Sequence, residues 1–445
     1  MAHQHDVVVV GAGPSGLAAA TTLVSGGLDV VVLEARDRVG GRTWTVDVDG
    51  SPVDLGGQWV GPTQHHLLDV IAHLGLSTSP TPTTGASMLV LQDRTVSYRG
   101  TIPRLSVLSL VQLQRALWDI DRQARRVDSA TVRSAREAQL DGMSLAEWMR
   151  ARHVRPDVES VVRTAMRIVF GHEAEAIPFL RFLQYVRAAG GVMPLVDTAG
   201  GAQDARIVGG AQQVSEGLAG PLGDRVRLGT PVTGVRVGDG VDVVTASGSV
   251  AARHLVMAVP PRLAAELDWA PGLSPVRQRW LASHEMGTTL KTQILYDRPF
   301  WRDADRSGEV VWADGDLDVA FDNSQDDGRA GLVVFATGDR GRRLGRLAPD
   351  ARRRTVLANL VDALGDDAGH PEAYIDHDWD TEPLSGGCPV ATPTLGAPVA
   401  GFDPTIPDGP VHWAGTETST VWRGYIDGAI AAGRRAATDI LAGVA

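Results

Sequence analysis

The first forty residues alternate between apolar runs and glycine turns. Val7 to Val10 is a run of β-branched side chains, which is typical of a strand buried on both faces. Leu17 to Val24 has the small apolar residues of a close-packed helix, and Gly26 and Gly27 end it. Val30 to Leu33 predicts a second strand, which ends at Glu34. The pattern predicts a strand–helix–strand unit.

The turn between the first strand and the helix carries the spacing of a dinucleotide-binding loop. Gly11 suits the tight turn, Gly13 the close approach of a pyrophosphate, and Gly16 the packing of helix against strand. Phosphates would lie at the helix N-terminus, and Glu34 would accept hydrogen bonds from a ribose. The alternative is a glycine turn in another α/β unit, but the ordered strand, turn, helix, strand and acid favour a bound ADP moiety.

Along the rest of the chain the hydrophobic pattern changes twice, first to helical periodicity and then to strand-like runs. Beyond about Pro80 the periodicity predicts helices, with either a substrate-facing or a structural role, at Leu105–Val127, Ser144–Arg152 and Asp157–Phe170. Ser144 and Glu147 fit a capping box. Gly238-Asp239-Gly240 predicts a hairpin. Four runs then predict a second sheet, at Thr288–Tyr296, Glu309–Trp312, Leu317–Phe321 and Gly331–Ala336. Asp350–Leu364 predicts a helix with Asp350 as N-cap.

Length and composition bound the class of protein. The 445 residues suffice for two or three structural units, and no apolar run approaches the ~18 residues of a membrane span. Met1 to Asp6 has no features of an export signal, and the only cysteine, Cys388, suits a reducing compartment, so we expect a soluble cytoplasmic protein. The net charge of −11 argues against a nucleic-acid partner. The 12 histidines show no metal-binding spacing, so no metal is expected.

One count stands out among the charged residues. Lysine and arginine together number 42, and Lys291 is the only lysine. Either this is chance, or the position needs a compact ammonium group that a planar guanidinium cannot replace.

Taken together, the motifs resemble the flavin-containing monoamine oxidases, within the wider flavin amine oxidase family. The resemblance covers almost the whole chain. The segments that carry it, in family order, are Gly11–Gly16 with Glu34, Arg38–Arg42, Asp54–Trp59, Gly200–Gln203, Thr289–Lys291, Trp379, Ser385–Cys388, Trp413–Glu417 and Gly424–Tyr425.

The resemblance implies a mixed α/β (α+β) fold with two discontinuous domains. A Rossmann-like FAD-binding domain would comprise residues 1–79, 208–282 and 383–445. A substrate-binding domain with a mixed β-sheet and helices would comprise residues 80–207 and 283–382. The sequence agrees with these boundaries, because it is glycine-rich in the first set of ranges and helical or sheet-like in its pattern between them.

The resemblance also assigns roles. The expected FAD-binding residues are Gly11, Gly13, Ser15, Gly16, Glu34, Arg36, Gly41, Arg42, Gly57, Gln58, Trp59, Val232, Trp379, Cys388, Gly415, Thr416, Glu417, Gly424, Tyr425 and Ile426. By the same resemblance, Lys291 holds a water near flavin N5, Tyr425 is one wall of the aromatic pair that flanks the amine, and Trp379 lies close to the ring. The alternatives are a lysine paired to a carboxylate and a core tryptophan. Cys388 either forms a thioether to the flavin or is a small buried hydrophobe.

The cavity expected from the resemblance is largely apolar. Its lining would comprise Ile168, Leu195, Val196, Gln203, Phe321, Phe335, Pro389 and Tyr425. Pro389 stands where the family usually has a second aromatic wall, so a narrow preference for flat arylalkylamines is in doubt. No cluster of carboxylates appears in this set, which favours a monoamine over a polyamine.

The expected reaction is therefore oxidation of a primary or secondary monoamine by FAD and O2, giving an imine and hydrogen peroxide. The alternatives are an L-amino-acid or polyamine oxidase of the same fold, or a flavin-binding protein without activity. No membrane anchor is expected, and a homodimer is one expected assembly.

Overall fold

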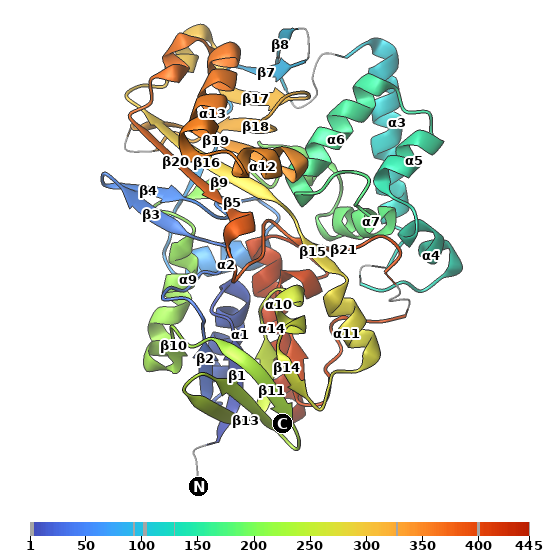
Figure 1. The fold of residues 1–445 in the computed structure, drawn as a ribbon, viewed down its shortest axis with the longest axis vertical. Coiled ribbons are helices and arrows are strands. Elements are labelled where there is room, and N and C mark those ends of the chain that lie inside the picture. Colours follow the sequence, from blue (N-terminus) through green and yellow to red (C-terminus); the bar gives the residue numbers. More distant parts are fainter. Residues whose placement is uncertain are drawn as a thin grey trace.

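The computed structural model of the protein describes residues 4–91, 94–100, 105–128, 130–325, 328–397 and 401–444. Met1 to His3, part of the segment in which no export signal was expected, lie outside the described residues. Two large sheets dominate the molecule. Figure 1 shows one at the bottom and the other at the upper left, with a group of helices at the upper right.

The first sheet has eight strands and begins with the predicted unit. β1 (His5–Val10) pairs in parallel with β2 (Val30–Leu33) on one side and with β13 (Gly248–Met257) on the other. The remaining strands are β10 (Val226–Arg227), β11 (Val232–Val237), β12 (Val241–Thr245), β14 (Asp268–Ala270) and β22 (Val411–Trp413). The sheet therefore draws on three separate stretches of the sequence.

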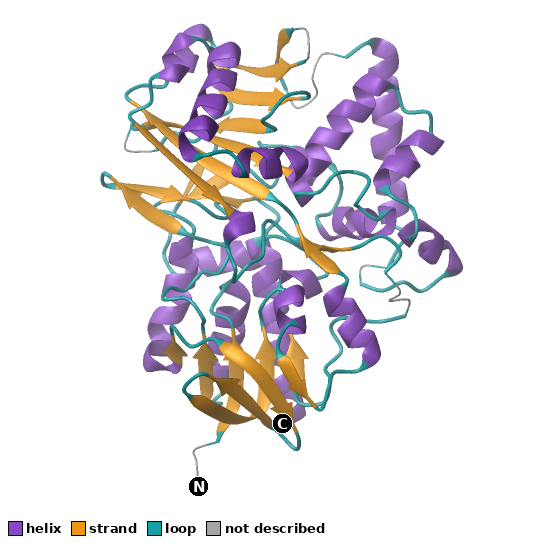
Figure 2. Ribbon diagram, in the orientation of Figure 1, coloured by secondary structure: helices purple, strands orange, loops and turns teal. Residues whose placement is uncertain are grey.

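Both faces of this sheet are covered, as the Val7–Val10 run predicts. Val7 and Val9 pack into one apolar cluster, and Val8 and Val10 into another on the opposite face. The first face is covered by α1 (Pro14–Ser25), α2 (His65–His73), α9 (Gln212–Ala219) and α14 (Ile426–Val444), and the second by α10 (Pro261–Ala265) and α11 (Pro275–Ala282). Figure 2 shows these helices beside the strands.

Two glycines are sterically required where other segments pack against α1. A Cβ atom at Gly16 would lie 1.9 Å from the carbonyl oxygen of Gly11, and one at Gly433 would lie 2.0 Å from that of Ser15. The turn and the C-terminal helix α14 can therefore approach α1 only because these residues lack side chains.

The second sheet has seven strands in the order β20-β16-β19-β18-β17-β7-β8. Their bounds are β7 (Ala86–Val90), β8 (Thr95–Tyr98), β16 (Thr289–Tyr296), β17 (Arg306–Trp312), β18 (Val319–Asp322), β19 (Ala330–Thr337) and β20 (Ala373–Asp378). One face packs on α12 (Gly338–Gly345) and α13 (Pro349–Leu364). The other face is turned toward the helical group.

The helical group forms a separate apolar core. It comprises α3 (Val107–Ala124), α4 (Ala135–Asp141), α5 (Leu145–Ala151), α6 (Pro156–Phe170), α7 (Phe179–Ala188) and α8 (Met193–Val196). The capping box predicted at Ser144 and Glu147 is confirmed, because each side chain accepts a hydrogen bond from the other residue's backbone N–H.

The remaining elements are short and connect the larger units. The strands are β3 (Thr45–Val48), β4 (Ser51–Asp54), β5 (Trp59–Val60), β6 (Thr78–Pro80), β9 (Ala205–Ile207), β15 (His284–Met286) and β21 (Ala391–Pro393). The 3₁₀ turns are η1 (Gly220–Arg225), η2 (Phe300–Ala304), η3 (Asp366–Gly369), η4 (Trp379–Thr381) and η5 (Thr416–Thr418).

The predicted hairpin is confirmed, since Val237 pairs with Val241 across Gly238–Gly240. The predicted N-cap Asp350 is wrong. The helix has Ala348 as its N-cap and Pro349 in its first turn, because proline needs no N–H partner there. Asp350 instead lies in the first turn, where a carboxylate still stabilises the positive end of the helix dipole.

Candidate functional site

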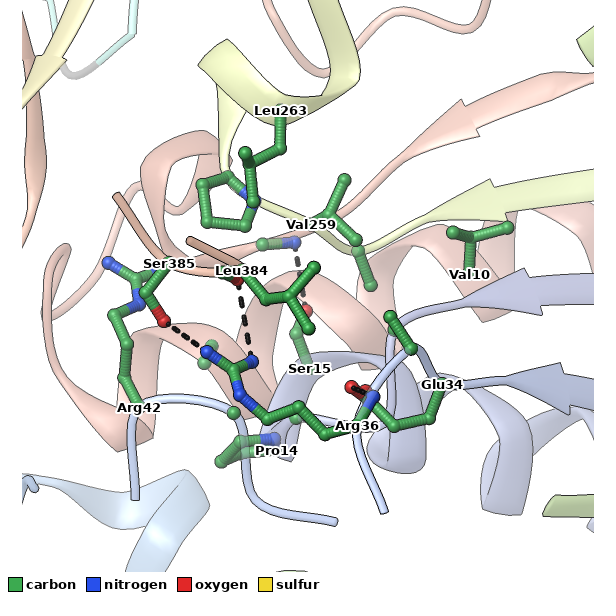
Figure 3. A pocket seen from close by; sticks show the side chains of 18 of the residues that line it. Val10, Pro14, Ser15, Glu34, Arg36, Arg42, Val259, Leu263, Leu384 and Ser385 are labelled. Carbon is green, nitrogen blue, oxygen red and sulfur yellow. Dashed lines mark hydrogen bonds between the residues drawn. The ribbon is translucent and has the colours of Figure 1, made fainter. Parts of the chain in front are cut away.

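A long channel begins at the N-terminus of α1. Its volume is about 540 Å³, and Figure 3 shows the side chains around it. We call it the nucleotide channel. The predicted residues that line it are Gly11, Gly13, Ser15, Glu34, Arg36, Gly41, Arg42, Gly57, Val232, Cys388, Gly415, Thr416, Gly424, Tyr425 and Ile426.

Backbone and side-chain hydrogen bonds fix the walls of this channel near Glu34 and Ser15. The carboxylate of Glu34 accepts hydrogen bonds from the backbone N–H groups of Ala12 (2.7 Å) and Arg36 (2.9 Å). The Ser15 hydroxyl accepts one from the N–H of Gly415, over 2.9 Å (Figure 3). The first turn, the second strand and the C-terminal segment are thus fixed to one another around the channel.

Five predicted cofactor residues lie outside the channel lining. Gly16 packs against the turn, and Glu417 lies behind Arg42. Gln58, Trp59 and Trp379 line a smaller space at the far end.

Arg42 and Glu417 form the main ion pair of the site. The guanidinium donates to both carboxylate oxygens of Glu417, over 2.8 and 3.2 Å, and to the carbonyl oxygen of Pro389 over 2.8 Å. Burial opposes ionisation of Glu417, but the charge and hydrogen bonds of Arg42 outweigh it and lower the pKa of the carboxyl. This pair joins three segments that are distant in the sequence.

The smaller space, which we call the inner chamber, has a volume of about 170 Å³. It adjoins the nucleotide channel, since Cys388, Pro389, Gly424, Tyr425 and Ile426 line both. The predicted residues that it brings together are Gly57, Gln58, Trp59, Ile168, Gln203, Lys291, Phe321, Phe335, Trp379, Cys388, Pro389, Gly424, Tyr425 and Ile426. Sequence positions spread over most of the chain thus meet in one cavity.

Lys291 lies on β16 with its ammonium group buried. Its Nζ donates to the carbonyl oxygen of Gly56 (2.7 Å) and to Oε1 of Gln58 (2.5 Å). Among the described residues no carboxylate lies within ion-pair distance of Nζ, although the charge of the nearby Asp54 carboxylate favours the ammonium form. Burial lowers the pKa of the ammonium to about 8.

Tyr425 has an aromatic neighbour that the sequence did not reveal. The hydroxyl groups of Tyr185 and Tyr425 are hydrogen-bonded to each other, and the two ring centroids are 6.2 Å apart. Tyr185 also lines the inner chamber. An aromatic group therefore accompanies Tyr425 although Pro389 replaces the expected second wall. Tyr185 lies on the largely buried helix α7, and no motif distinguishes it from a core residue.

Cys388 and Trp379 border the same chamber. Burial raises the pKa of the Cys388 thiol to about 11, although the nearby charges of Arg42 and Lys291 lower it. The Trp379 indole N–H donates to the carbonyl oxygen of Leu55 over 2.9 Å, which fixes its ring in the wall.

A third cavity, the outer chamber, extends from the inner one and has a volume of about 360 Å³. Ile168, Val169, Gln203 and Phe321 line both chambers. The predicted cavity residues Leu195 and Val196 line only the outer one. The expected apolar cavity is therefore divided in two.

Metal sites and membrane-spanning helices are both absent from the described part of the chain. No three of its His, Cys, Asp and Glu side chains lie close enough together to hold a metal ion. None of its helices is both long and apolar enough to cross a membrane.

The shape of these spaces fits FAD. The turn at Gly13 leaves room for phosphates, because even an added Cβ atom there would lie 3.9 Å from the Cα of Gly41. Gly13, the N-cap of α1, makes no side-chain capping hydrogen bond, so the first N–H groups of the helix can donate to phosphates. The continuity of the channel with the inner chamber would place the adenosine end at Glu34 and the isoalloxazine ring beside Lys291 and Tyr425.

Comparisons with known proteins agree with this geometry. A family model described as flavin containing amine oxidoreductase matches residues 14–441. A Mycobacterium tuberculosis protein described as a flavin-containing monoamine oxidase is 38% identical over 98% of this chain and 96% of its own. Putrescine oxidase of Kocuria rosea is 35% identical over 98% of this chain and 95% of its own. The structure of cyclohexylamine oxidase from Brevibacterium oxydans superposes with a TM-score of 0.95, at 30% identity, and covers 99% of this chain and 100% of that chain.

Replacement of Glu417 by Gln tests the buried ion pair. The variant leaves the Arg42 charge without its partner, so we expect the free energy of unfolding to fall by about 3 kcal/mol. The pKa of Glu417 is lowered in the folded state, so its contribution is present above the unfolded-state pKa and is lost as pH falls through the folded-state value. Urea unfolding at neutral and acidic pH measures both effects.

Asp305→Asn is the matched control, because Asp305 pairs with Arg99 on the surface. An equal loss of stability in both variants, or no loss in Glu417→Gln, would contradict the role assigned to the buried pair.

Proposed function

This chain belongs to the family of flavin-containing amine oxidoreductases, and we propose that it oxidises a primary or secondary amine bound between FAD and Tyr425. It is an oxidoreductase that acts on amines. The proposed products are an imine, which hydrolyses to an aldehyde and ammonia or an amine, and hydrogen peroxide from O2.

One observation carries this proposal. The only ammonium side chain of the protein and a hydrogen-bonded tyrosine face the same small chamber, which is continuous with the nucleotide channel. When bound, FAD would supply the hydride acceptor. We propose that Lys291 holds a water molecule at the acceptor and that the ring of Tyr425 orients the amine.

The inner chamber favours a neutral amine. Among its described lining residues there is no Asp, Glu or His, and its only formal positive charge is that of Lys291. A substrate ammonium group would lose its hydration and gain no counterion there, which is costly. We infer that the substrate loses its proton before it reaches Tyr425.

The walls also limit the substrate class. Most of the lining of both chambers is apolar, which supports a monoamine with an apolar substituent. No arginine occurs among the described lining residues, so nothing there would clamp the carboxylate of an amino acid. One relative is named a putrescine oxidase, which makes a diamine the second candidate.

The finer organisation is proposed on the same basis. Every strand of the eight-stranded sheet comes from residues 1–79, 208–282 and 383–445, and every strand of the seven-stranded sheet comes from residues 80–207 and 283–382. This supports the two discontinuous domains. The cytoplasmic location and the homodimer stay predictions from the sequence.

Anaerobic mixing of the FAD-loaded protein with a panel of amines and L-amino acids tests the function. We expect monoamines to bleach the flavin absorbance near 450 nm, because the chamber accepts a neutral amine next to the ring. L-amino acids should not bleach it, because they lack a carboxylate clamp. An FAD-loaded protein that no amine reduces would contradict the proposal and favour a flavin-binding role without activity.

Lys291→Met tests the ammonium group. We expect FAD to stay bound and reoxidation by O2 to slow on the order of a hundredfold, as for the loss of one preorganised charged donor. Wild-type reoxidation should also slow as pH rises through about 8, because the ammonium then loses its proton, and the variant should lack this step. Stopped-flow absorbance measures both.

Lys291→Arg is the matched variant, because it keeps a cation but not the compact amine. In this variant the part of the reoxidation rate that depends on the positive charge should persist to a higher pH, because a guanidinium keeps its proton to a higher pH than an ammonium group. An unchanged reoxidation rate in Lys291→Met would remove this role.

We propose that Cys388 forms a thioether bond to the 8α-methyl group of the flavin. Acid precipitation tests whether the flavin is covalently bound. The new C–S bond replaces the S–H bond and one methyl C–H bond, and O2 finally accepts the two electrons and two protons. We expect a yellow pellet from the wild-type protein and a yellow supernatant from Cys388→Ser. A yellow supernatant from the wild type would show that the flavin is held without a covalent bond.

A further inference from the structure

The described lining of the outer chamber contains one charged group and is otherwise uncharged. Helices α3, α6 and α8 contribute mainly aliphatic side chains to its walls, among them Leu117, Val162 and Leu195. Glu309, on β17, is the only charged side chain among the described residues that line it. A carboxylate in such surroundings is costly unless a ligand or a partner compensates for it.

The register of the second sheet places Glu309 on the same face as Lys291, at the other end of the cavity. Lys291 pairs with Phe335, Phe335 with Val319, and Val319 with Val311. Glu309 precedes Val311 by two residues, and both line the outer chamber. The strands of Lys291 and Glu309 are three positions apart in the sheet, which corresponds to about 14 Å between strand axes.

Glu309 has hydrogen-bond donors but no cation. The Ser87 hydroxyl donates to its Oε2 over 3.1 Å, and the Tyr98 hydroxyl also bonds to the carboxylate. Within the described part of the chain, Glu309 makes no ion pair with an arginine, lysine or histidine. Burial raises the pKa of its carboxyl, and the two hydrogen bonds offset this only in part.

A second carboxylate, that of Asp197, lies near Glu309. Asp197 follows α8 and lies between Val196 and Thr198, both of which line the outer chamber. Its Oδ1 is buried with no hydrogen-bond partner among the described residues, and its charge is close enough to disfavour ionisation of Glu309. Glu309 thus lies in the cavity wall and Asp197 close to it, and within the described ranges neither forms an ion pair with a basic side chain.

We propose that Glu309, supported by Asp197, binds a second ammonium group of the substrate at the far end of the outer chamber. This deepens the proposed amine oxidation and rests on it. The reacting amine lies neutral at Tyr425, the spacer crosses the apolar walls near Ile168 and Phe321, and the distal cation pairs with Glu309.

A distal cation site at Glu309 would favour diamines of a particular carbon-chain length. A spacer on the order of eight to ten carbon atoms would span the separation of the two ends. In a short diamine the second ammonium would remain in the apolar section or close to Lys291, where it gains no counterion. Short diamines should therefore be poorer substrates than monoamines of equal length, and long diamines should be better ones.

The test compares kcat/KM for α,ω-diamines with that for n-alkylamines of the same length, from four to twelve carbon atoms, using the FAD-loaded protein. We expect the diamine-to-monoamine ratio to lie below one for the shortest pair and to rise by at least about tenfold for the long pairs, as one charge-assisted hydrogen bond would give. Glu309→Gln should remove this rise. Because each ratio is taken within one protein preparation, loss of folded enzyme cancels from it.

A control variant and a second series of substrates test whether the effect comes from the charge of Glu309. Glu216→Gln, the same substitution on the exposed surface of α9, should keep the wild-type ratio. The α,ω-amino alcohols should not share the gain of the diamines, because a hydroxyl carries no charge. If long amino alcohols gain as much as diamines, Glu309 acts as a neutral hydrogen-bonding group and the proposed cation site is wrong.

The chain-length series in the wild type decides the proposal even if Glu309→Gln fails to fold. A ratio that stays flat with length while monoamines still bleach the flavin would overturn the distal cation site and leave amine oxidation intact. If no amine bleaches the flavin, the proposed function itself fails.

Discussion

The constraint that organises this molecule is the burial of a single ammonium group. Lys291 is held by a backbone carbonyl and by Gln58. The amide of Gln58 is itself oriented by Asn323 over 2.9 Å and by Gln293 over 3.2 Å. A buried ammonium group that makes no direct ion pair within the described residues is stable only if such dipoles are fixed in advance. The network achieves this by joining the segment after β4 to the second sheet, so the position of Lys291 depends on the contact between the two sheets.

The same contact explains why the chain is interleaved. The inner chamber needs walls from the glycine segment near Gly57, from β16 and from the start of α14, and these lie far apart in the sequence. The Arg42–Glu417 pair holds the first and last of the FAD-side segments together and fixes the backbone at Pro389. A cavity built in this way can be polar at one end, for phosphates, and apolar at the other, for an amine with its carbon chain.

Much of the site could be predicted because the signal lies in local sequence. Gly11, Gly13 and Glu34 follow a spacing set by the geometry of one strand–helix–strand unit, and Lys291 stands out because no other lysine occurs. Tyr185 and Glu309 could not be predicted, because their roles depend on long-range packing. Tyr185 belongs to a helix whose apolar pattern is that of an ordinary core, and Glu309 reaches the cavity only through the register of four strands. The cavity lining expected from the sequence contained no cluster of carboxylates. It therefore omitted Glu309, which the second sheet places in the wall of the outer chamber.

The most direct measurement is a crystal structure of the FAD-loaded protein. We expect the adenosine ribose at Glu34 and the pyrophosphate at the N-terminus of α1. The isoalloxazine ring should lie between Lys291 and Tyr425, with a water molecule bridging the Lys291 amine and flavin N5. A ring bound elsewhere, or a Lys291 side chain remote from N5, would contradict the arrangement on which the chemistry depends.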